Sequence, residues 1–348
     1  MRRILRAALL SAGVAIRAAA FTPVLPTAND AIFEGRPQDF YMYVDRDFEG
    51  RKSKPWQGGG YGFTREPQRI AGKIVPVKFH EGIDIRPLRR DAAGEPLDPV
   101  IAVEDGRVVH TSTAARDSNY GKYVVIEHQV DDSPVYTIYA HLESIDVQTG
   151  QSARQGARLG RMGHTGEGIN RERAHLHLEI AILWNDGFES WHRANFPTPN
   201  KHGVYNGINL MGLDTAAFYL AQKEDPSLTL PGFIRSREAY FRVRVPESPR
   251  FQLVRRYPWL VKGNREGARS WLVSFTSAGF PIAADAAPEE VTQPRVEWIK
   301  PSDIPPEEAT RSLVAGSSEH PRFGSAGEKL MRLILWDPND ARSTEKGL

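Results

Sequence analysis

Short β-type runs between residues 73 and 183 are the feature that most constrains the fold of this chain. They are rich in Val, Ile, Tyr and Leu, and Gly, Pro, Asp or Asn residues bound them. Their spacing favours an antiparallel, mainly β domain over alternating βαβ units. The runs are Lys73–Lys78, Pro99–Val103, Arg107–Thr111, Tyr123–His128, Val135–Tyr139 and His175–Leu183.

The rest of the chain divides around this region. Leu213–Lys223 has helical spacing and is expected to close the domain. Beyond it we expect an α+β or β-rich unit, with strands at Arg242–Val245, Gln252–Val254 and Trp271–Phe275 and a helix or strand at Glu328–Leu335. The predicted organisation is an approach segment (21–59), a domain (60–224) with an insertion at 185–206, and a C-terminal accessory unit (225–348).

Composition excludes several functions. The net charge of the 348 residues is only +2, and no long Lys/Arg block is present, so we expect no nucleic-acid partner. The chain has no cysteine, which excludes disulfides, thiolate zinc ligands and a cysteine nucleophile. Any zinc would be held by nitrogen and oxygen atoms.

The N-terminus has the pattern of an export signal. Three arginines precede the small apolar run Ala7–Ile16, and Ala18-Ala19-Ala20 offers a cleavage site, which predicts a signal peptide over residues 1–20. The protein would then be exported to the periplasm or the extracellular cell envelope, with no membrane span after cleavage. Arg17 leaves open an amphipathic first helix in a cytoplasmic protein.

Four of the ten histidines lie in three short motifs with β-type surroundings. Side chains alternate across a strand, so His175 and His177 are expected on one face of a sheet. The same rule predicts that Tyr139 and His141 share a face. Two adjacent strands would thus present three imidazoles to one groove.

The third motif contains His80 and Asp84, four residues apart with Gly82 between them. It is not the helical H-E-x-x-H zinc motif, because position 84 is Asp and Gly is a poor helix former. A bent, extended segment would let both side chains converge. Together with one histidine of the His175/His177 pair they make an N,N,O set, which suits zinc with an open coordination position.

Through these and neighbouring motifs, residues 60–182 resemble the lysostaphin-type zinc metalloendopeptidases of bacterial cell walls. The resemblance is an ordered series of motifs. In chain order they are Gly60-Tyr61-Gly62-Phe63-Thr64-Arg65, His80-Glu81-Gly82-Ile83-Asp84-Ile85, Pro99–Val109, Gly121–His128, Tyr139-Ala140-His141-Leu142, Gly150–Gly166 and His175-Leu176-His177-Leu178-Glu179.

The resemblance implies a fold, a cofactor and a substrate. The fold is an antiparallel β-sheet metallopeptidase domain of the duplicated-hybrid-motif type with an open groove. One Zn²⁺ per chain would be held by His80, Asp84 and His177, with His141 and His175 as catalytic histidines. The substrates would be peptidoglycan peptide stems, whose cross-links a metal-activated water hydrolyses.

Other functions remain open beside this one. Some members of the family have lost metal ligands and act as non-catalytic envelope scaffolds or activators of other wall hydrolases, whereas all five positions are filled here. A protease of the same fold that processes a protein is another alternative. A partner of the C-terminal unit remains unknown.

The sequence departs from the family pattern outside the motifs. Arg173-Ala174 replaces the usual Gly-Pro, and Leu88–Pro96 and Asn185–Asn206 are additions. We expect these additions and the C-terminal unit to restrict or target the enzyme while the core performs the chemistry. The aromatic residues Trp191 and Phe196 either bind substrate or only pin the second addition to the domain.

Overall fold

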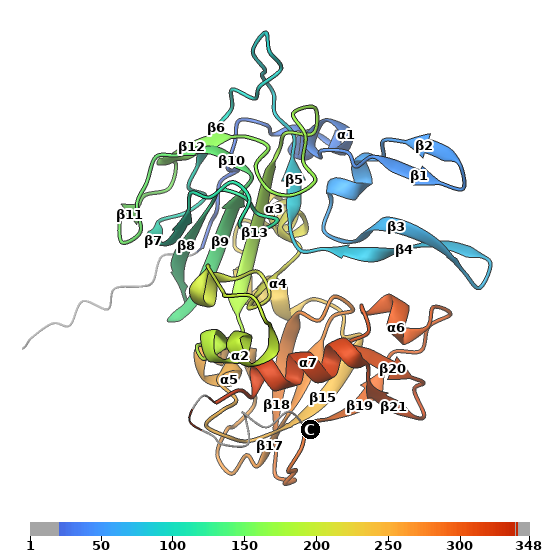
Figure 1. The fold of residues 1–348 in the computed structure, drawn as a ribbon. Coiled ribbons are helices and arrows are strands. Elements are labelled where there is room, and N and C mark those ends of the chain that lie inside the picture. Colours follow the sequence, from blue (N-terminus) through green and yellow to red (C-terminus); the bar gives the residue numbers. More distant parts are fainter. Residues whose placement is uncertain (1–20, 338, 340–348) are drawn as a thin grey trace, which may run out of the picture.

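The computed structural model describes residues 21–337 and 339. The predicted signal peptide therefore lies outside the described residues. The chain is mainly β, as predicted, and antiparallel pairing dominates its sheets (Figure 1). Among the described residues, no helix has the length and apolar character that a membrane crossing requires.

A seven-stranded sheet carries most of the predicted strands. Its order is β11-β7-β8-β9-β13-β14. Strand β5 pairs with residues 176–178 of β13, at the opposite end of β13 from its pairing with β14. The turn from β8 to β9 has two residues with positive φ, Asp131 (47°) and Asp132 (60°), as tight hairpins require. The strands are β5 (Ile83–Ile85), β7 (Gly106–Ser112), β8 (Tyr123–Val130), β9 (Ser133–Ala140), β11 (Ser152–Ala153), β13 (Leu176–Leu183) and β14 (Leu210–Gly212).

A smaller sheet covers one face of the large one. It has the order β10-β12-β6 and consists of β10 (Leu142–Ile145), β12 (Arg158–Met162) and β6 (Pro99–Ile101). Leu176 and Leu178 of β13 point into the buried core shared with this sheet, which also contains Val100 and Leu159. The opposite face of β13 is therefore free to carry His177, as strand alternation predicts.

Two hairpins project from this domain on the same side (Figure 1). They are formed by β1 (Arg46–Phe48) with β2 (Arg51–Ser53) and by β3 (Gly62–Ile70) with β4 (Lys73–His80). Short helices α1 (Pro37–Phe40), α2 (Phe188–Asn195), α3 (Thr215–Glu224) and α4 (Leu230–Arg235) complete this part. Helix α3 matches the predicted closing helix, and Asp214 caps it by accepting a hydrogen bond from the Ala217 amide at 3.0 Å.

The C-terminal part contains a five-stranded sheet of order β16-β18-β17-β15-β19. The strands predicted at Arg242–Val245 and Trp271–Phe275 are present. The strand predicted at Gln252–Val254 is wrong, because helix α5 begins at Leu253. An apolar run of this length is too short to distinguish the periodicity of a helix from that of a strand. The elements are β15 (Phe241–Pro246), α5 (Leu253–Arg256), β16 (Val261–Lys262), β17 (Ser270–Phe275), β18 (Pro281–Ala287), β19 (Arg295–Ile299), α6 (Pro306–Ala309), β20 (Val314–Gly316), β21 (Pro321–Phe323) and α7 (Ser325–Ile334).

One hydrophobic core runs across the boundary predicted at residue 224. It joins Ile180 and Trp184 of the preceding domain to Phe241, Val273 and other apolar side chains of the C-terminal part. The buried Asn185 side chain adds hydrogen bonds to the carbonyls of Leu333 and Ile334 at 3.0 and 3.3 Å. The division into two units stays a prediction, since the two parts share apolar burial.

Candidate metal centre

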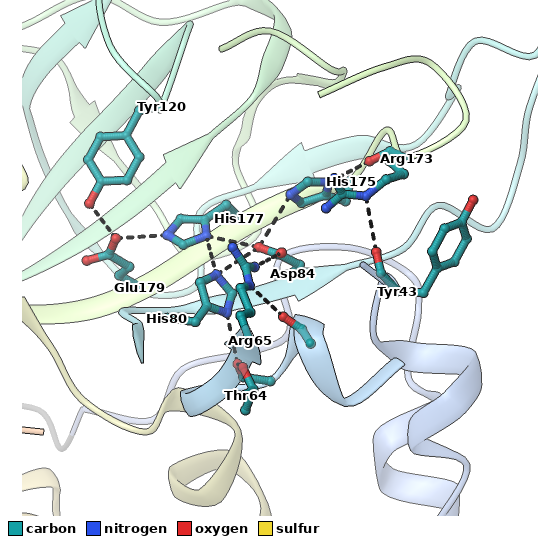
Figure 2. Close-up of polar contacts among 12 residues, drawn as sticks. Tyr43, Thr64, Arg65, His80, Asp84, Tyr120, Arg173, His175, His177 and Glu179 are labelled. Carbon is teal, nitrogen blue, oxygen red and sulfur yellow. Dashed lines mark hydrogen bonds and ion pairs between the residues drawn. The ribbon is translucent and has the colours of Figure 1, made fainter. Parts of the chain in front are cut away.

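His80, Asp84 and His177 come together in the structure. One ligand atom from each lies within 4.8 Å of the others, and their exposed fractions are 3, 2 and 5%. His80 ends β4, Asp84 is in β5 and His177 is in β13, where it lies directly opposite Asp84 in the antiparallel register. Figure 2 shows the three side chains pointing toward one another.

Gly82 makes this approach possible. A Cβ atom at this position would lie 2.5 Å from the Leu178 carbonyl oxygen and 2.9 Å from Cε1 of His177. Only glycine therefore lets the bend between β4 and β5 reach β13. The bent, extended segment predicted for residues 80–84 is present, since β4 ends at His80 and β5 begins at Ile83.

Each of the four histidines has one ring nitrogen bound to an oxygen acceptor. The N–H groups donate from His80 Nδ1 to the Gly60 carbonyl (2.8 Å), from His141 Nδ1 to the Thr165 carbonyl (2.9 Å), from His175 Nδ1 to the Arg173 carbonyl (2.6 Å) and from His177 Nε2 to the Glu179 carboxylate (2.8 Å). A neutral imidazole carries only one proton, so the other nitrogen presents a lone pair. Three of these lone pairs face Asp84.

This donor set fits a cation. Oδ1 of Asp84 lies 3.0 Å from His177 Nδ1 and 3.1 Å from His80 Nε2, and the two nitrogens are 3.1 Å apart. Unprotonated nitrogens and a carboxylate at such distances repel each other unless a proton or a metal ion lies between them. Two imidazoles and one carboxylate, with no sulfur ligand, are a set that zinc accepts.

The protonation behaviour of Asp84 and His177 also favours a bound cation. Burial opposes the charge on Asp84, but the neighbouring imidazoles of His175 and His80 help hold its pKa well below the usual range. Burial lowers the pKa of His177, yet hydrogen bonds to Asp84 and Glu179 outweigh this effect and raise it to about 9. Without a metal ion, a proton therefore occupies Nδ1 of His177 beside Asp84 at neutral pH, and a bound cation would take the place of this proton.

Arg65 is a residue of the centre that sequence reasoning missed. Its Nη2 donates to Oδ2 of Asp84 at 2.6 Å, and its Nε donates to the Gly58 carbonyl at 2.8 Å (Figure 2). Oδ2 is thereby occupied, which leaves Oδ1 for a metal. The signal was its place in the glycine-rich motif before His80, where an arginine has no evident packing role.

His141 and His175 lie beside the three candidate metal ligands. Their ring centroids are 4.7 Å apart, and that of His141 is 5.7 Å from that of His177. The predicted common face of Tyr139 and His141 is wrong: Tyr139 points into the core between the sheets. His141 has a φ of 62°, which ends the strand alternation and turns its side chain toward His175 and His177.

Glu179 connects the centre to a second layer of side chains. Its buried Oε1 accepts hydrogen bonds from His177 and from the hydroxyl of Tyr120 (Figure 2). Its Oε2 has no hydrogen-bond partner among the residues that the structure describes. A carboxylate in this position fixes the tautomer of a metal-binding histidine and increases its basicity.

The addition at Leu88–Pro96 supports the loop before β13. Its Arg90 side chain donates to the carbonyls of Arg171 (2.8 Å), Glu172 (3.0 Å) and Ala174 (3.5 Å). This loop contains Arg173-Ala174, where the resemblance described above predicts Gly-Pro. The Arg173 carbonyl accepts the His175 proton, so the addition holds the backbone that orients a predicted catalytic residue.

Comparison with known proteins identifies the family. Residues 78–187 match peptidase family M23. The lipoprotein NlpD of Yersinia enterocolitica is 31% identical over 90 residues, which cover 26% of this chain and 84% of that protein. The chain belongs to peptidase family M23. All four histidines and Asp84 fall within the matched residues.

Two further relatives are named for different functions, one as an activator of hydrolases and one as an endopeptidase. The murein hydrolase activator NlpD of Escherichia coli is 36% identical over 90 residues, 26% of this chain and 21% of that protein. The peptidoglycan DD-endopeptidase ShyB of Vibrio cholerae is 32% identical over 115 residues, 32% of this chain and 22% of that protein. The match thus spans about a fifth of the length of these relatives.

Among solved structures, the M23 chain resembles the catalytic domain of lysostaphin from Staphylococcus simulans. The identity is 20%, over 46% of this chain and 88% of that domain, with a TM-score of 0.28.

Proposed function

We propose that this chain is a zinc-dependent endopeptidase that hydrolyses peptide cross-links of bacterial peptidoglycan. The observation that carries the proposal is the arrangement of the imidazoles. Four histidines each have one ring nitrogen held by an oxygen acceptor, and the other nitrogen of three of them lies 3.0 to 3.3 Å from Oδ1 of Asp84. A scaffold that had lost its chemistry would have no need of this arrangement. Export to the cell envelope is part of the proposal, because the substrate is there.

The residues divide into two roles. His80, Asp84 and His177 would hold one zinc ion, which when bound polarises a carbonyl group and lowers the pKa of water to about 7. Arg65 keeps Asp84 in place, and Glu179 accepts the Nε2 proton of His177, so that Nδ1 is the nitrogen that would face the metal.

His141 and His175 handle protons in this proposal. Nδ1 of each donates to a backbone carbonyl, so each Nε2 is able to accept a proton from the attacking water. The resulting imidazolium donates to the oxyanion of the tetrahedral intermediate and then protonates the leaving amine. Burial and the adjacent His175 and His177 hold the pKa of His141 well below its usual range, which keeps Nε2 unprotonated before the reaction.

Hydrolysis of purified sacculi by the full-length chain tests the proposal. With zinc we expect new peptide termini, detected by mass spectrometry of the released fragments. His80→Ala, Asp84→Ala and His177→Ala should each lose both zinc and hydrolysis, while Lys262→Met serves as a control far from the ligands in the sequence. Full zinc occupancy in all three variants would refute the ligand assignment.

The name of the Escherichia coli relative, a murein hydrolase activator, supplies a second candidate function. The same preparation, added to sacculi with a purified wall amidase, separates the two. Activation of the amidase with no peptide cleavage by this chain alone, even when zinc is bound, would favour the activator. Cleavage of a protein substrate but not of sacculi would favour a protein-processing protease.

A further inference from the structure

Arg311, in the C-terminal part, reaches the segment that carries the candidate ligand His80. Its Nη1 donates to Oε1 of Glu81 at 3.2 Å, and its Cζ lies 4.2 Å from the ring centroid of Phe79. Its Nη2 donates to the Ala278 carbonyl at 3.1 Å, which ties the guanidinium group to the C-terminal part. One side chain from outside the M23-matched residues 78–187 therefore contacts both sequence neighbours of His80.

The backbone at Arg311 has a conformation that residues with a Cβ atom rarely adopt. Arg311 has a φ of 56° and Ser312 has a φ of 59°, both in the left-handed region. Such a conformation persists only where the surrounding structure enforces it, and it is common at functional sites. The turn follows helix α6, which lies below β3 and β4 in the view of Figure 1. It gives Arg311 a direction that an ordinary helical or extended backbone would not give.

Helices α6 and α7 enforce this turn. The Ser312 amide donates to the Glu307 carbonyl of α6 at 2.7 Å, and the Ser312 carbonyl accepts from two amides of α7 at 3.1 and 3.2 Å. A Cβ atom at Gly327 of α7 would overlap the carbonyl oxygen of Leu313, so α7 packs this closely only because glycine is present. The turn thus holds Arg311 in a fixed place.

The segment that Arg311 contacts is also packed closely against the M23-matched domain. Glu81 begins the bend between β4 and β5. A Cβ atom at Gly212 of β14 would overlap the carbonyl oxygen of Glu81, so the bend rests directly on this strand. Phe79 is only 7% exposed. A bend that β14 and Arg311 both hold has little freedom to move, and His80 moves with it.

Neither contact of Arg311 is strong alone. The side chains of Arg311 and Glu81 are 31 and 41% exposed, so water screens their ion pair. The cation–π contact with Phe79 acts in addition. Both contacts act on the same three-residue segment, and metal–ligand distances tolerate only about 0.2 Å of displacement. A modest restraint on this segment is therefore enough to change metal affinity.

We propose that Arg311 is a positioning residue of the metal centre, which holds His80 in place for the ion through Glu81 and Phe79. The proposal rests on the zinc endopeptidase function proposed above. Arg311 acts through the bend and touches neither the ion nor the reacting atoms. The C-terminal part would thereby contribute to metal retention and turnover, beyond the restriction or targeting expected from the sequence.

Zinc affinity of the full chain, measured by competition with a chromophoric chelator, tests the proposal. Arg311→Met should weaken it by about three- to tenfold, the loss expected when a partly exposed ion pair and a cation–π contact are removed together. Arg244→Met is the matched control, because the ion pair of Arg244 with Glu297, at 2.8 Å, joins β15 to β19 within the five-stranded sheet. It should leave zinc affinity unchanged, and chemical denaturation shows whether each variant is folded.

Glu81→Gln tests the same contact from the other side. It should weaken zinc affinity by less than Arg311→Met, because the contact with Phe79 remains. Residues that act through one contact are not additive, so the double variant should be no weaker than Arg311→Met alone. Arg311→Lys should recover only part of the affinity, because a compact ammonium group does not reach Glu81 and Ala278 together as a guanidinium does.

Turnover gives a readout that distinguishes positioning from substrate binding. At saturating zinc, Arg311→Met should lower kcat and leave KM unchanged, because the ligand is displaced and no substrate contact is lost. A raised KM with wild-type zinc affinity would overturn the proposal, since Arg311 would then contact the substrate. An equal loss of zinc affinity in Arg244→Met would also overturn it, because the effect would then be a general loosening of the C-terminal part.

The affinity measurement separates this proposal from the endopeptidase function. If Arg311→Met weakens zinc binding as expected but the zinc-loaded wild type does not cleave sacculi, the endopeptidase function fails and the positioning role stands. If sacculi are cleaved and folded Arg311→Met binds zinc as the wild type does, the positioning proposal fails alone. A wild type that binds no zinc would refute both.

Discussion

Gly82→Ala is expected to disrupt the metal centre while changing no ligand. The new Cβ would lie 2.5 Å from the Leu178 carbonyl oxygen, whereas ordinary contacts begin at 3.4 Å, so the two strands must separate locally by about 0.9 Å. The obstacle is backbone of β13, and a side-chain rotation does not relieve it. Because His177 and Asp84 are paired in this register, the movement pulls two ligands apart.

The expected loss of zinc affinity and activity follows from how little displacement a metal site tolerates in its ligands. Metal–ligand distances are held within about 0.2 Å, and a misplacement of about 1 Å costs about 100-fold in activity. We expect Gly82→Ala to weaken zinc binding and hydrolysis by about 100-fold or more, and overpacking to reduce the free energy of unfolding by about 1–3 kcal/mol.

Competition with a chromophoric zinc chelator measures the affinity, and chemical denaturation measures the stability. Gly60→Ala is the matched control, because its Cβ would meet only the Gln57 carbonyl, at 3.3 Å, and its own carbonyl to His80 is kept. Wild-type zinc affinity in a folded Gly82→Ala protein would refute the close-approach argument.

Four further predictions concern single side chains. His141→Ala and His175→Ala should keep zinc and lose about 10²–10⁴-fold in turnover; metal loss in either folded variant would contradict the division of roles. Glu179→Gln should weaken zinc affinity by about 10–100-fold, measured by chelator competition against Glu127→Gln. Arg90→Met should keep zinc and lower kcat by about tenfold. Arg90→Lys should not restore kcat, because an ammonium group does not span three carbonyls as a guanidinium does. An unchanged kcat in Arg90→Met would refute the positioning role. Burial lowers the pKa of His128 to about 4, so below about pH 6.5 the unfolded chain takes up a proton that the folded chain excludes. The free energy of unfolding of the wild type should therefore fall between about pH 6.5 and pH 4. This fall should exceed that of His128→Gln by about 3 kcal/mol.

The strands and the ligand motifs were predictable because they depend on local patterns. Strand β13 is recognisable from its apolar alternation and β-branched residues, and the i, i+2 rule places Leu176 and Leu178 in the core. The same rule failed at His141, where a positive φ ends the alternation. Alternation holds only while the backbone stays extended, and the sequence Tyr-Ala-His-Leu does not mark the point at which it stops.

The partners of the ligands were not predictable for a different reason. The acceptors for three of the histidine protons are backbone carbonyls, those of Gly60, Thr165 and Arg173. A carbonyl is present at every residue, so no residue type records which one faces an imidazole. Only the Glu179 carboxylate, two residues after His177, left a readable sign.

The contribution of the C-terminal part was out of reach of sequence reasoning because it depends on contacts over long sequence separations. Arg311 places its guanidinium 4.2 Å from the Phe79 ring centroid and donates to Glu81, so it meets residues on both sides of His80. Every proposed ligand and catalytic residue lies between His80 and His177, which agrees with chemistry performed by the core alone. A chain cut after α3 would nevertheless expose the core cluster that α4, α7 and the five-stranded sheet cover. Loss of activity on truncation would therefore mix unfolding with the loss of any direct contribution from the C-terminal part. A point substitution such as Arg311→Met, which removes the contact to Glu81 without deleting the covering elements, separates the two.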